Sequence, residues 1–424
     1  MSMIPLTHVC RYWRDSIIST PENWTLIRNR WLKLAKLSLE RAKAAPLAIH
    51  LHVQLDRKFV DLLRSHVESI ESLSYRGYSV LGGLIKALPN FPKSTPKLRS
   101  LALEERSRPD LRLLNPFEFS TDTMLRELPL SHVPLLPSLL SLRSLTKFFL
   151  FDTHFDLHVD TLLNFLEENR SLESASLMAT FTKPSLTHSR RRTPVGNRLQ
   201  HLLLSGHSAV DLRPLISGIA LRKGATLALD LSGAEALARI FSGVPTTHLS
   251  NLSSPTSMEY RQSPRKIRLI GADGSFSCYD RGSTKTSFEE FPHLPLASVR
   301  ELRLQCCGSR ILTEFRLSFS PSLEVLAIHG GSSISFLSPE PSTSTPSPSL
   351  RTLAFMDCVI TKDFMATLTQ IALHRKNSTS KSLHRVVIVG SKWQFPPRAS
   401  VQRLREYVPI VEVLMGREFP KDLS

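Results

Sequence analysis

Cysteine is scarce in this 424-residue chain, and long apolar runs are absent. The five cysteines are odd in number and include no C-x-x-C pair: Cys10, Cys278, Cys306, Cys307 and Cys358. We therefore expect reduced thiols in an intracellular protein of the cytoplasm or nucleus. No run of 18 or more apolar residues occurs, and no charged N-terminal segment leads into a short apolar one. The sequence thus predicts neither a membrane span nor a secretory signal.

Catalytic and cofactor motifs are missing as well. The sequence contains no G-x-S-x-G, P-loop, G-x-G-x-x-G or H-E-x-x-H motif, so we predict neither an enzyme nor a bound cofactor. The phrase "GADGSF" from Gly271 favours a turn over a phosphate site, because it has no strand-to-helix context and no lysine. His50 and His52 would share one face of a strand, but without a third ligand nearby we interpret them as rim histidines. Cys306 and Cys307 are adjacent and would bridge only with strain, so packing is favoured over redox chemistry.

Positive charge is in excess. Lys and Arg number 54 against 37 Asp and Glu, a formal net charge of +17. This balance favours acidic partners, which include nucleic acid, an anionic membrane surface and an acidic protein face. The phrase "SRRRTP" from Ser189 is either a solvated loop or a patch for anion contact or nuclear import. With four Trp and six Tyr the chain has few rings on which bases could stack, so nucleic-acid binding rests on charge alone.

A phrase with apolar residues at relative positions 1, 4 and 6 recurs along the chain. The first apolar residue, called the anchor below, recurs in steps of 27, 20, 27 and 27 residues and, after a gap of 100, in steps of 24, 27 and 33. The anchors are Leu98, Leu125, Leu145, Leu172, Leu199, Val299, Leu323, Leu350 and Leu383. Weaker copies have anchors at Ile70, Thr226 and Pro264. So regular a recurrence predicts a repeat architecture.

The pattern of each repeat predicts one strand and one helix. Positions 4 and 6 alternate with polar neighbours, as in a short strand with one buried face. Helical patterns lie between the phrases at Val159–Asn169, Lys362–Lys376 and Val401–Val408. One strand and one helix cannot bury their apolar faces alone, so neighbouring repeats must stack. Segments rich in Ser, Thr and Pro at 182–197, 242–265 and 337–349 are predicted loops, and the repeat register stays open across 232–297.

The phrase resembles the L-x-x-L-x-L core of leucine-rich repeats, in their long strand-plus-helix variety, over roughly 46–416. It departs from that family by lacking a regular Asn or Cys after the strand, for which Cys306, Cys307 and Cys358 are scattered candidates. The resemblance implies an α/β solenoid of about eleven repeats that binds protein. Because side chains alternate along a strand, we expect a concave surface that contacts substrate through exposed residues: Arg99, Arg126, Gln200, Arg300 and Arg351.

The opening phrase "LTHVCRYWRDSI" predicts an amphipathic helix. Its apolar residues fall at offsets 0, 3, 4, 7 and 11, on one helix face: Leu6, Val9, Cys10, Trp13 and Ile17. Pro21 predicts an end near Thr20, and we expect Trp24 to fold back over the apolar face. The simplest interpretation is a cap that covers the open end of a repeat core.

The same segment resembles the C-terminal part of an F-box, where a helix of the form L-x-x-V-C-x-x-W-R precedes a short turn and another Trp. The matching residues are Leu6, Val9, Cys10, Trp13, Arg14, Pro21 and Trp24. A full F-box begins with a segment like L-P-x-E-x-x-x-x-I-F, whereas five residues precede Leu6 here, so about half of the module is missing. The following segment, Trp31 to Val53, is similar to that of fungal F-box proteins with leucine-rich repeats.

The resemblance implies a substrate-recognition subunit of a Skp, cullin and F-box ubiquitin ligase. In this hypothesis Leu6, Val9, Cys10 and Trp13 hold a Skp-family linker protein, which joins a cullin complex, and the repeats present a protein substrate. Two alternatives stay open: a free-standing scaffold with a vestigial F-box, and a basic binder of RNA or anionic surfaces. The implied organisation is an F-box-like cap (1–32), a linking helix (33–45), a solenoid (46–416) and a tail (417–424).

Overall fold

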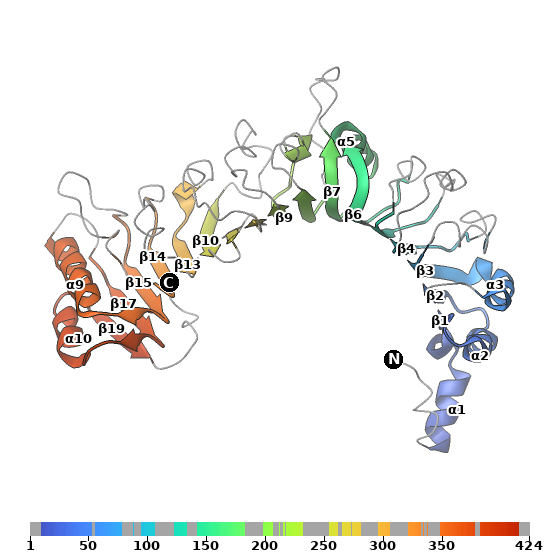
Figure 1. The fold of residues 1–424 in the computed structure, drawn as a ribbon, viewed down its shortest axis with the longest axis horizontal. Helices are drawn as coiled ribbons and strands as arrows, with labels where there is room; N and C mark the ends of the chain where they lie inside the picture. Colours follow the sequence, from blue (N-terminus) through green and yellow to red (C-terminus); the bar gives the residue numbers. More distant parts are fainter. Residues whose placement is uncertain are drawn as a thin grey trace. The chain divides into compact units, whose positions relative to one another are not determined.

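The computed structural model describes the greater part of the chain, and its elements are drawn in Figure 1. The described residues are 10–52, 56–78, 88, 95–106, 123–133, 142–182, 198–206, 212, 215–216, 218–231, 254–261, 265–272, 274–280, 296–305, 321–331, 334, 337, 348–377 and 382–414. Within these ranges lie six α-helices and a long, mostly parallel sheet of 17 strands. The chain divides into two compact units, Met1–Leu202 and Leu203–Ser424.

The elements have the following bounds. The helices are α1 (Arg11–Ser19), α2 (Leu32–Ala42), α3 (Arg57–Arg64), α5 (Val159–Glu168), α9 (Lys362–Asn377) and α10 (Arg398–Arg405), with short 3₁₀ helices η2 (Pro21–Trp24), η3 (Val67–Ser69) and η9 (Leu296–Ser298). Strands of the first unit are β1 (Leu26–Arg28), β2 (Leu47–His52), β3 (Ile70–Gly77), β4 (Ser100–Glu105), β5 (Glu127–Ser131), β6 (Lys147–His158) and β7 (Ser174–Thr182). Strand β8 (His201–Gly206) spans the boundary between the units. Strands of the second unit are β9 (Ala225–Leu231), β10 (Pro255–Arg261), β11 (Arg265–Gly271), β12 (Gly274–Asp280), β13 (Glu301–Gln305), β14 (Val325–His329), β15 (Thr352–Met356), β16 (Val359–Ile360), β17 (Arg385–Val389), β18 (Lys392–Trp393) and β19 (Ile410–Leu414).

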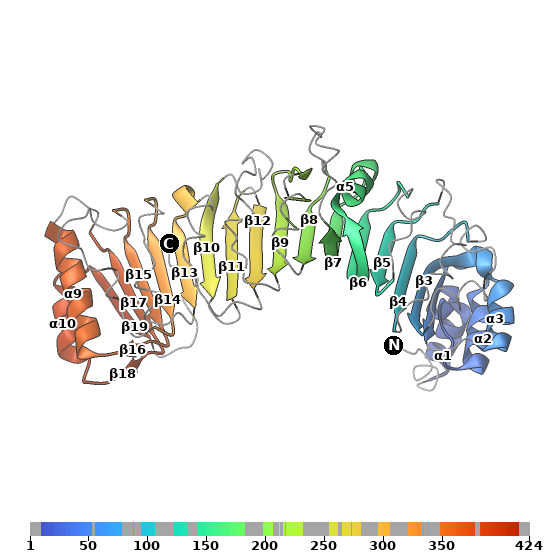
Figure 2. The same cartoon turned by 45° about the horizontal axis from the view of Figure 1, so that its top comes forward.

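In the first unit, strands β1 to β7 pair in chain order and in parallel (Figure 2). The pairing keeps the same repeat position in register from one strand to the next. Position 6 of the phrase, for example, forms one continuous buried row: Tyr75, Leu103, Leu130, Leu150 and Leu177. Parallel in-register pairing of sequential strands is the architecture that a strand-per-repeat solenoid requires.

The recurring phrase is confirmed as the unit of this sheet. All nine anchors are at most 4% exposed, and positions 4 and 6 are buried with them. Phe148 of β6 packs on Phe165 of α5 with 4.8 Å between ring centroids, so positions 4 and 6 face the helices. We call this side of the sheet the core face and the opposite side the open face. The three predicted helices are confirmed as α5, α9 and α10, with ends shifted by up to three residues.

The second unit repeats the arrangement from β13 onward. Strands β13, β14, β15, β17 and β19 pair in parallel and in chain order. Phe355 of β15 contacts Phe364 of α9 at 5.0 Å, edge to face, which again places the helix against positions 4 and 6. Beyond the strand ends, β16 and β18 form a small parallel pair of their own.

Between β9 and β13 the repeat is interrupted by an antiparallel insertion. Strand β12 pairs in parallel with β9 and antiparallel with β11; β11 pairs antiparallel with β10, and β10 in parallel with β13. The spatial order is therefore β9, β12, β11, β10, β13. The predicted loop at 242–265 is wrong for Pro255–Arg261, because that segment is β10 and buries Met258 and Tyr260 at 1% exposure each.

Two of the weaker repeat copies need correction. Thr226 is only partly buried, and the buried residues are Ala225, Leu227 and Leu229, so Gly224 stands where the anchor should. Gly224 has φ +86°, a conformation that glycine adopts at little cost. Pro264 lies outside the described residues, and the strand that follows it, β11, runs antiparallel to its neighbours although Ile267 and Leu269 are buried.

The sheet begins earlier than the sequence indicated. Strand β1, in the stretch assigned to the helical cap, pairs in parallel with β2 and buries Ile27 at 1% exposure. The Asn29 side chain extends this pairing: its Nδ2 donates to the His52 carbonyl and its Oδ1 accepts from the His52 amide, each at 2.9 Å. The cap is thus joined to the repeats by backbone pairing as well as by side-chain packing. Helix α2, Leu32–Ala42, overlaps the segment 33–45 that was expected to be a linking helix.

Candidate interaction surfaces

The first helix is described from Arg11, with Cys10 at its N-cap position in an extended conformation. It ends at Ser19, and Thr20 is extended ahead of Pro21, as predicted. Leu6 and Val9, two of the four residues predicted to contact the linker protein, lie outside the described residues. The other two, Cys10 and Trp13, are exposed, Trp13 by 52%.

Trp24 folds back onto this helix, as expected. Its indole Nε1 donates a hydrogen bond to the Ile17 carbonyl at 2.8 Å, and both side chains are at most 5% exposed. The Arg41 guanidinium of α2 lies 4.3 Å from the centroid of the Trp24 ring, a cation–π contact. These contacts fix α1 against α2 through a single buried aromatic residue.

The apolar stripe of α1 extends from the buried Ile17 toward the N-terminal end of the helix, where it is exposed to solvent. Trp13 lies one turn before Ile17, on the same face, because residues four apart are neighbours on a helix. Beside it, Tyr12 is 77% exposed and contacts Trp13 edge to face at 6.4 Å. A large aromatic pair in solvent at the end of a fixed helix is the kind of surface that binds another protein.

The predicted substrate residues fall into rows. Each occupies position 2 of the phrase, between a buried anchor and the first residue of a strand, so it borders the sheet at one end. Backbone hydrogen bonds connect successive members of each row. The Arg126 amide donates to the Arg99 carbonyl at 2.7 Å. The amides of Thr146, Glu173 and Gln200 each donate in the same way to the carbonyl of the preceding member, so the row extends to Gln200. In the second unit Glu324 donates to Arg300 and Arg351 to Glu324, both at 2.8 Å. The structure thus brings Arg99, Arg126 and Gln200 into one row and Arg300 and Arg351 into another.

These rows carry charges of both signs. Arg99 forms an ion pair with Glu71 at 3.2 Å, and Glu324 stands between Arg300 and Arg351. All the arginines are exposed, whereas Gln200 is partly buried. Mixed charge at the border of a sheet face resembles the polar rim of a protein interface more closely than the single-sign stripe of a nucleic-acid binder.

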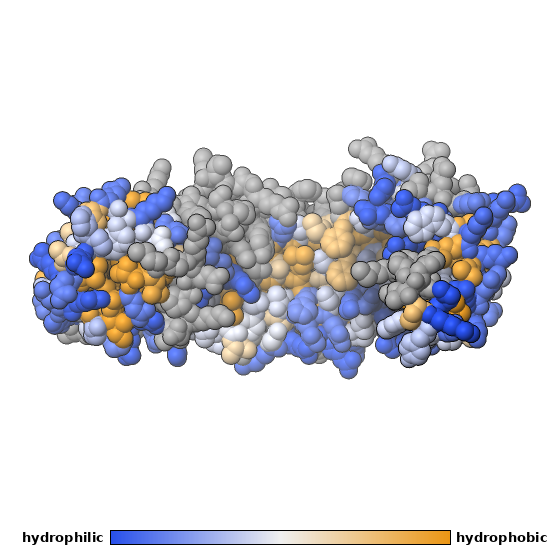
Figure 3. Space-filling view, turned by 90° about the horizontal axis from the view of Figure 1, so that it is seen from below, coloured by the Kyte–Doolittle hydropathy of each residue, from blue (hydrophilic) through white to orange (hydrophobic). Residues whose placement is uncertain are grey.

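An aromatic cluster on the open face of the first unit was missed by the sequence reasoning. The rings of Phe149 and Phe151 stack with centroids 6.2 Å apart and planes 5° from parallel, and both are partly exposed. Pro129 pairs with Phe149, and Met178 with Phe151, on the adjoining strands. The signal in the sequence was the run "FFLF", which is apolar at both alternate positions and therefore on both faces. Figure 3 shows apolar areas bordered by hydrophilic ones on one side of the molecule.

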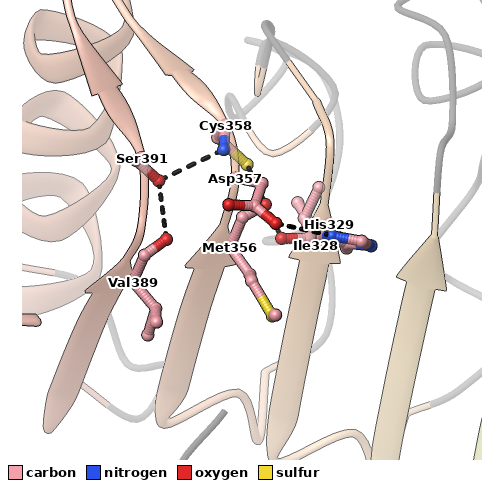
Figure 4. Close-up of polar contacts among 7 residues, drawn as sticks. All are labelled: Ile328, His329, Met356, Asp357, Cys358, Val389 and Ser391. Atoms are coloured by element: carbon pink, nitrogen blue, oxygen red, sulfur yellow. Dashed lines mark hydrogen bonds and ion pairs between the residues drawn. The ribbon is translucent and has the colours of Figure 1, made fainter. Parts of the chain in front are cut away.

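Cys358 occupies the position after the strand where a leucine-rich repeat has Asn or Cys (Figure 4). Its thiol lies 3.3 Å from the Met356 carbonyl and 3.6 Å from that of Ile328, and its amide donates to Ser391 Oγ at 3.2 Å. The Ser391 hydroxyl in turn donates to the Val389 carbonyl. Burial raises the pKa of Cys358 to about 11, which favours the neutral thiol and, with its burial, a packing role.

Neither the other cysteines nor the histidine pair forms a metal site among the described residues. Cys306 and Cys307 lie outside the described residues. His50 is partly buried and His52 exposed; burial, Arg28 and His52 lower the pKa of His50, in that order. Within the described ranges, no three His, Cys, Asp or Glu residues are placed to hold a metal ion. No helix in the same ranges has the length and apolar character needed to cross a membrane.

Comparisons with known proteins assign the chain to no family and find distant structural similarity. No model of a known protein family matches it, and no curated protein does. Among solved structures it is similar to the crystal structure of an internalin, InlF, from Listeria monocytogenes, with a TM-score of 0.35 and 13% identity, covering 92% of this chain and 93% of that chain. Since similarity at this level carries no functional inference, the fold described above rests on this chain's own strand pairing.

Proposed function

We propose that this chain is a protein-interaction scaffold that serves as the substrate-recognition subunit of a Skp, cullin and F-box ubiquitin ligase in the cytoplasm or nucleus. In this proposal the N-terminal segment that leads into α1, together with the start of that helix, docks a Skp-family linker protein through Leu6, Val9, Cys10 and Trp13. The sheet binds a protein substrate along the row that contains Arg99, Arg126 and Gln200, and along that of Arg300 and Arg351.

The observation that carries the linker half of the proposal is the exposure of Trp13. The same helix face buries Ile17 one turn later, where Trp24 covers it, and then runs into solvent with Trp13 52% exposed. A solvent-exposed indole favours the binding of a partner protein, because its burial in an interface removes a large apolar area from solvent.

The proposal that the sheet binds a protein substrate is supported by the arrangement of side chains on the open face. In the first unit, Phe149 and Phe151 supply an aromatic centre, and the ion pairs Arg76–Glu104 and Lys147–Glu127 lie on the same face. An apolar centre surrounded by paired charges is typical of protein interfaces. The proposed substrate is therefore a folded protein or an extended segment with an apolar anchor and mixed charges.

The test is affinity purification of the tagged chain from its own cells, followed by mass spectrometry. We expect Skp-family and cullin proteins to co-purify with the wild type and to be lost with Trp13→Ala. The matched control is Ile18→Ala, an exposed apolar residue at 37% on another face of the same helix, which should keep both partners. If linker and cullin are absent from the wild type while other proteins remain bound, the chain is a free-standing scaffold.

The basic alternative gives a different result in the same purification. RNA or anionic lipid would be recovered with the wild type, and the recovery would fall steeply between about 50 and 200 mM salt. Trp13→Ala would leave that binding unchanged, because the substitution removes no charge.

A further inference from the structure

Three basic side chains gather on the open face of β1 and β2, at the beginning of the first unit. We call them the basic cluster: Arg28, His50 and His52. Arg28 lies directly opposite His50 in the parallel pairing of the two strands, and His52 follows two residues further along β2. Their positions alternate with those of the buried Ile27 and Ile49. All three side chains are therefore on the same side of the sheet.

Elsewhere on the open face of the first unit, basic residues lie opposite acidic ones. Arg76 of β3 is paired in register with Glu104 of β4, and the two side chains form an ion pair. Glu127 of β5 and Lys147 of β6 are also opposite each other, and 2.7 Å separates the Lys147 Nζ from the Glu127 Oε1. Opposite charges at directly paired positions stabilise a sheet, whereas like charges destabilise it. These two pairs therefore balance their charges within the sheet itself.

In the basic cluster, the paired positions are basic on both strands. Arg28 lies opposite His50, and His52 lies opposite Arg76, whose guanidinium is engaged by Glu104. After burial, the groups that lower the pKa of His50 are Arg28 and His52. Both of these neighbours carry or can acquire positive charge. An anion from outside the sheet would therefore stabilise the protonated imidazole of His50.

The carboxylates that lie closest to the cluster along the chain have other partners. Glu71, in β3, forms an ion pair with Arg99 at 3.2 Å. Asp56 lies four residues after His52 and accepts a hydrogen bond from the Lys58 amide at 3.0 Å, as the N-cap of α3. Among the described residues, no acidic side chain forms an ion pair with the cluster. The cluster is thus a concentration of positive charge that the described part of the fold does not neutralise.

The backbone holds the cluster in one arrangement. The Asn29 side chain bonds both the amide and the carbonyl of His52 at 2.9 Å, and the Asn29 amide donates to the His50 carbonyl at 3.4 Å. Strands β1 and β2 are thereby tied together at the cluster itself, which lowers the entropic cost of binding a ligand there. On the other side of β2, Ser74 lies opposite His50 and adds a hydroxyl. A guanidinium, two imidazoles and a hydroxyl can donate hydrogen bonds from several directions.

We propose that the basic cluster binds a phosphate group, with Arg28, His50 and His52 as its donors and the Ser74 hydroxyl as a further one. A phosphate group presents more acceptor oxygens than a carboxylate and presents them in more directions, which suits donors from three strands. The cluster is the size of one such group, whereas a nucleic-acid surface engages a series of phosphates. The ligand is therefore a small phosphate compound, either inorganic phosphate or a phosphate ester.

The first experiment is an NMR titration of the full wild-type chain with inorganic phosphate, followed through the ring signals of His50 and His52. We expect saturable shifts with a Kd of about 1 mM. The pKa of His50 should rise on binding, because a bound anion favours the imidazolium. Sodium chloride at the same ionic strength is the control and should give no saturable shift. Equal shifts with chloride, or no shift up to about 10 mM phosphate, would overturn the proposal.

A pair of variants separates this site from the general positive charge of the chain. Arg28→Gln removes the permanent cation and should weaken phosphate binding about tenfold. Arg170→Gln removes the same charge from an exposed arginine after α5 and should bind like the wild type. Equal weakening in the two variants would contradict the proposal. Circular dichroism checks the fold of Arg28→Gln; if that variant is unfolded, His52→Gln, at an exposed position, takes its place with the same expectation.

Phenyl phosphate distinguishes the two sources of the phosphate group. Tighter binding of phenyl phosphate than of inorganic phosphate assigns the cluster to an ester, and the reverse order assigns it to free phosphate. Failure of both compounds to bind would refute the site. None of these results depends on whether the N-terminal segment docks a linker protein, because the titrations contain only this chain and the phosphate compound.

Discussion

The indole Nε1 of Trp24 donates to the backbone carbonyl of Ile17 across 2.8 Å, and this bond joins the first helix to the rest of the cap. Both residues are buried, so a replacement that removes the donor leaves the Ile17 carbonyl without it.

The cap therefore has a graded sensitivity at position 24. Trp24→Phe keeps most of the packing and should lower the free energy of unfolding of the cap by about 1–2 kcal/mol. Trp24→Ala also creates a cavity and should cost about 3–5 kcal/mol. Hydrogen exchange of peptides from α1 and α2 measures the loss. Trp31→Phe, at a residue 52% exposed, should leave exchange unchanged; equal effects at positions 24 and 31 would contradict the role of the hydrogen bond.

A second prediction concerns Gly271, at the turn between β11 and β12. A Cβ atom at this position would stand 2.6 Å from the Ser254 carbonyl oxygen and 3.0 Å from the Pro255 Cα, both backbone atoms. Gly271→Ala should therefore force the antiparallel strands apart and destabilise the second unit by about 1–3 kcal/mol.

The control for Gly271 is Gly224. A Cβ there meets nothing within 4 Å, and its φ of +86° alone should cost about 1 kcal/mol. Urea unfolding followed by circular dichroism compares the two variants. If Gly271→Ala proved as mild as Gly224→Ala, the close approach to Ser254 would carry no energetic weight.

The cysteines provide a third prediction. At pH 8, iodoacetamide should modify the exposed Cys10 in the native chain and spare Cys358 until denaturant is added. Burial raises the pKa of the Cys358 thiol from 9.0 to about 11, so the folded chain holds this proton more tightly than the unfolded one. The resulting stability is present below pH 9 and is lost as the pH rises to 11. Mass spectrometry of the labelled peptides decides; native labelling of Cys358 would refute the assignment.

A fourth prediction uses His50 on the open face of β2. Burial, Arg28 and His52 lower the pKa of His50, so the folded chain binds its proton less tightly than the unfolded chain does. The neutral His50 therefore stabilises the fold above pH 6.5, and this contribution is lost as the pH falls below that value. His50→Gln should reduce the loss of stability between about pH 7 and pH 5.

Urea unfolding at each pH measures stability, and the NMR titration of His50 reports its pKa directly. A titration midpoint of His50 above 6.5 would reverse the predicted sign.

The sequence predicted the strands because leucine at positions 1, 4 and 6 requires burial on one side. Leu98, Leu101 and Leu103 illustrate this, all at most 4% exposed. The alternation of apolar and polar residues, however, does not indicate in which direction a strand runs. The strand containing Ile267 and Leu269 has the pattern of one more repeat, although it pairs antiparallel. Nor does alternation exclude a slip by two residues, which leaves every side chain on the same face and explains the error at Thr226.

The interaction surfaces were less predictable than the core. The exposure of Trp13 depends on where Trp24 packs, and a helix pattern alone does not show which part of an apolar stripe is covered. The buried open-face residues of β14, β15 and β17 can be recognised in the sequence, because "VLAIH", "TLAFM" and "RVVIV" are nearly continuous apolar runs. Such runs indicate strands buried on both faces.

The antiparallel insertion sets a rule of parity for this fold. Elsewhere in the stack one repeat can be gained or lost, since every strand points the same way. Between β9 and β13, the three strands β12, β11 and β10 return the chain to its original direction only because their number is odd. If consecutive strands here remain antiparallel, loss of β11 alone would leave the chain at the end of the sheet opposite to that from which the connections between parallel repeats start. A change in length that keeps this antiparallel arrangement must therefore add or remove strands in pairs.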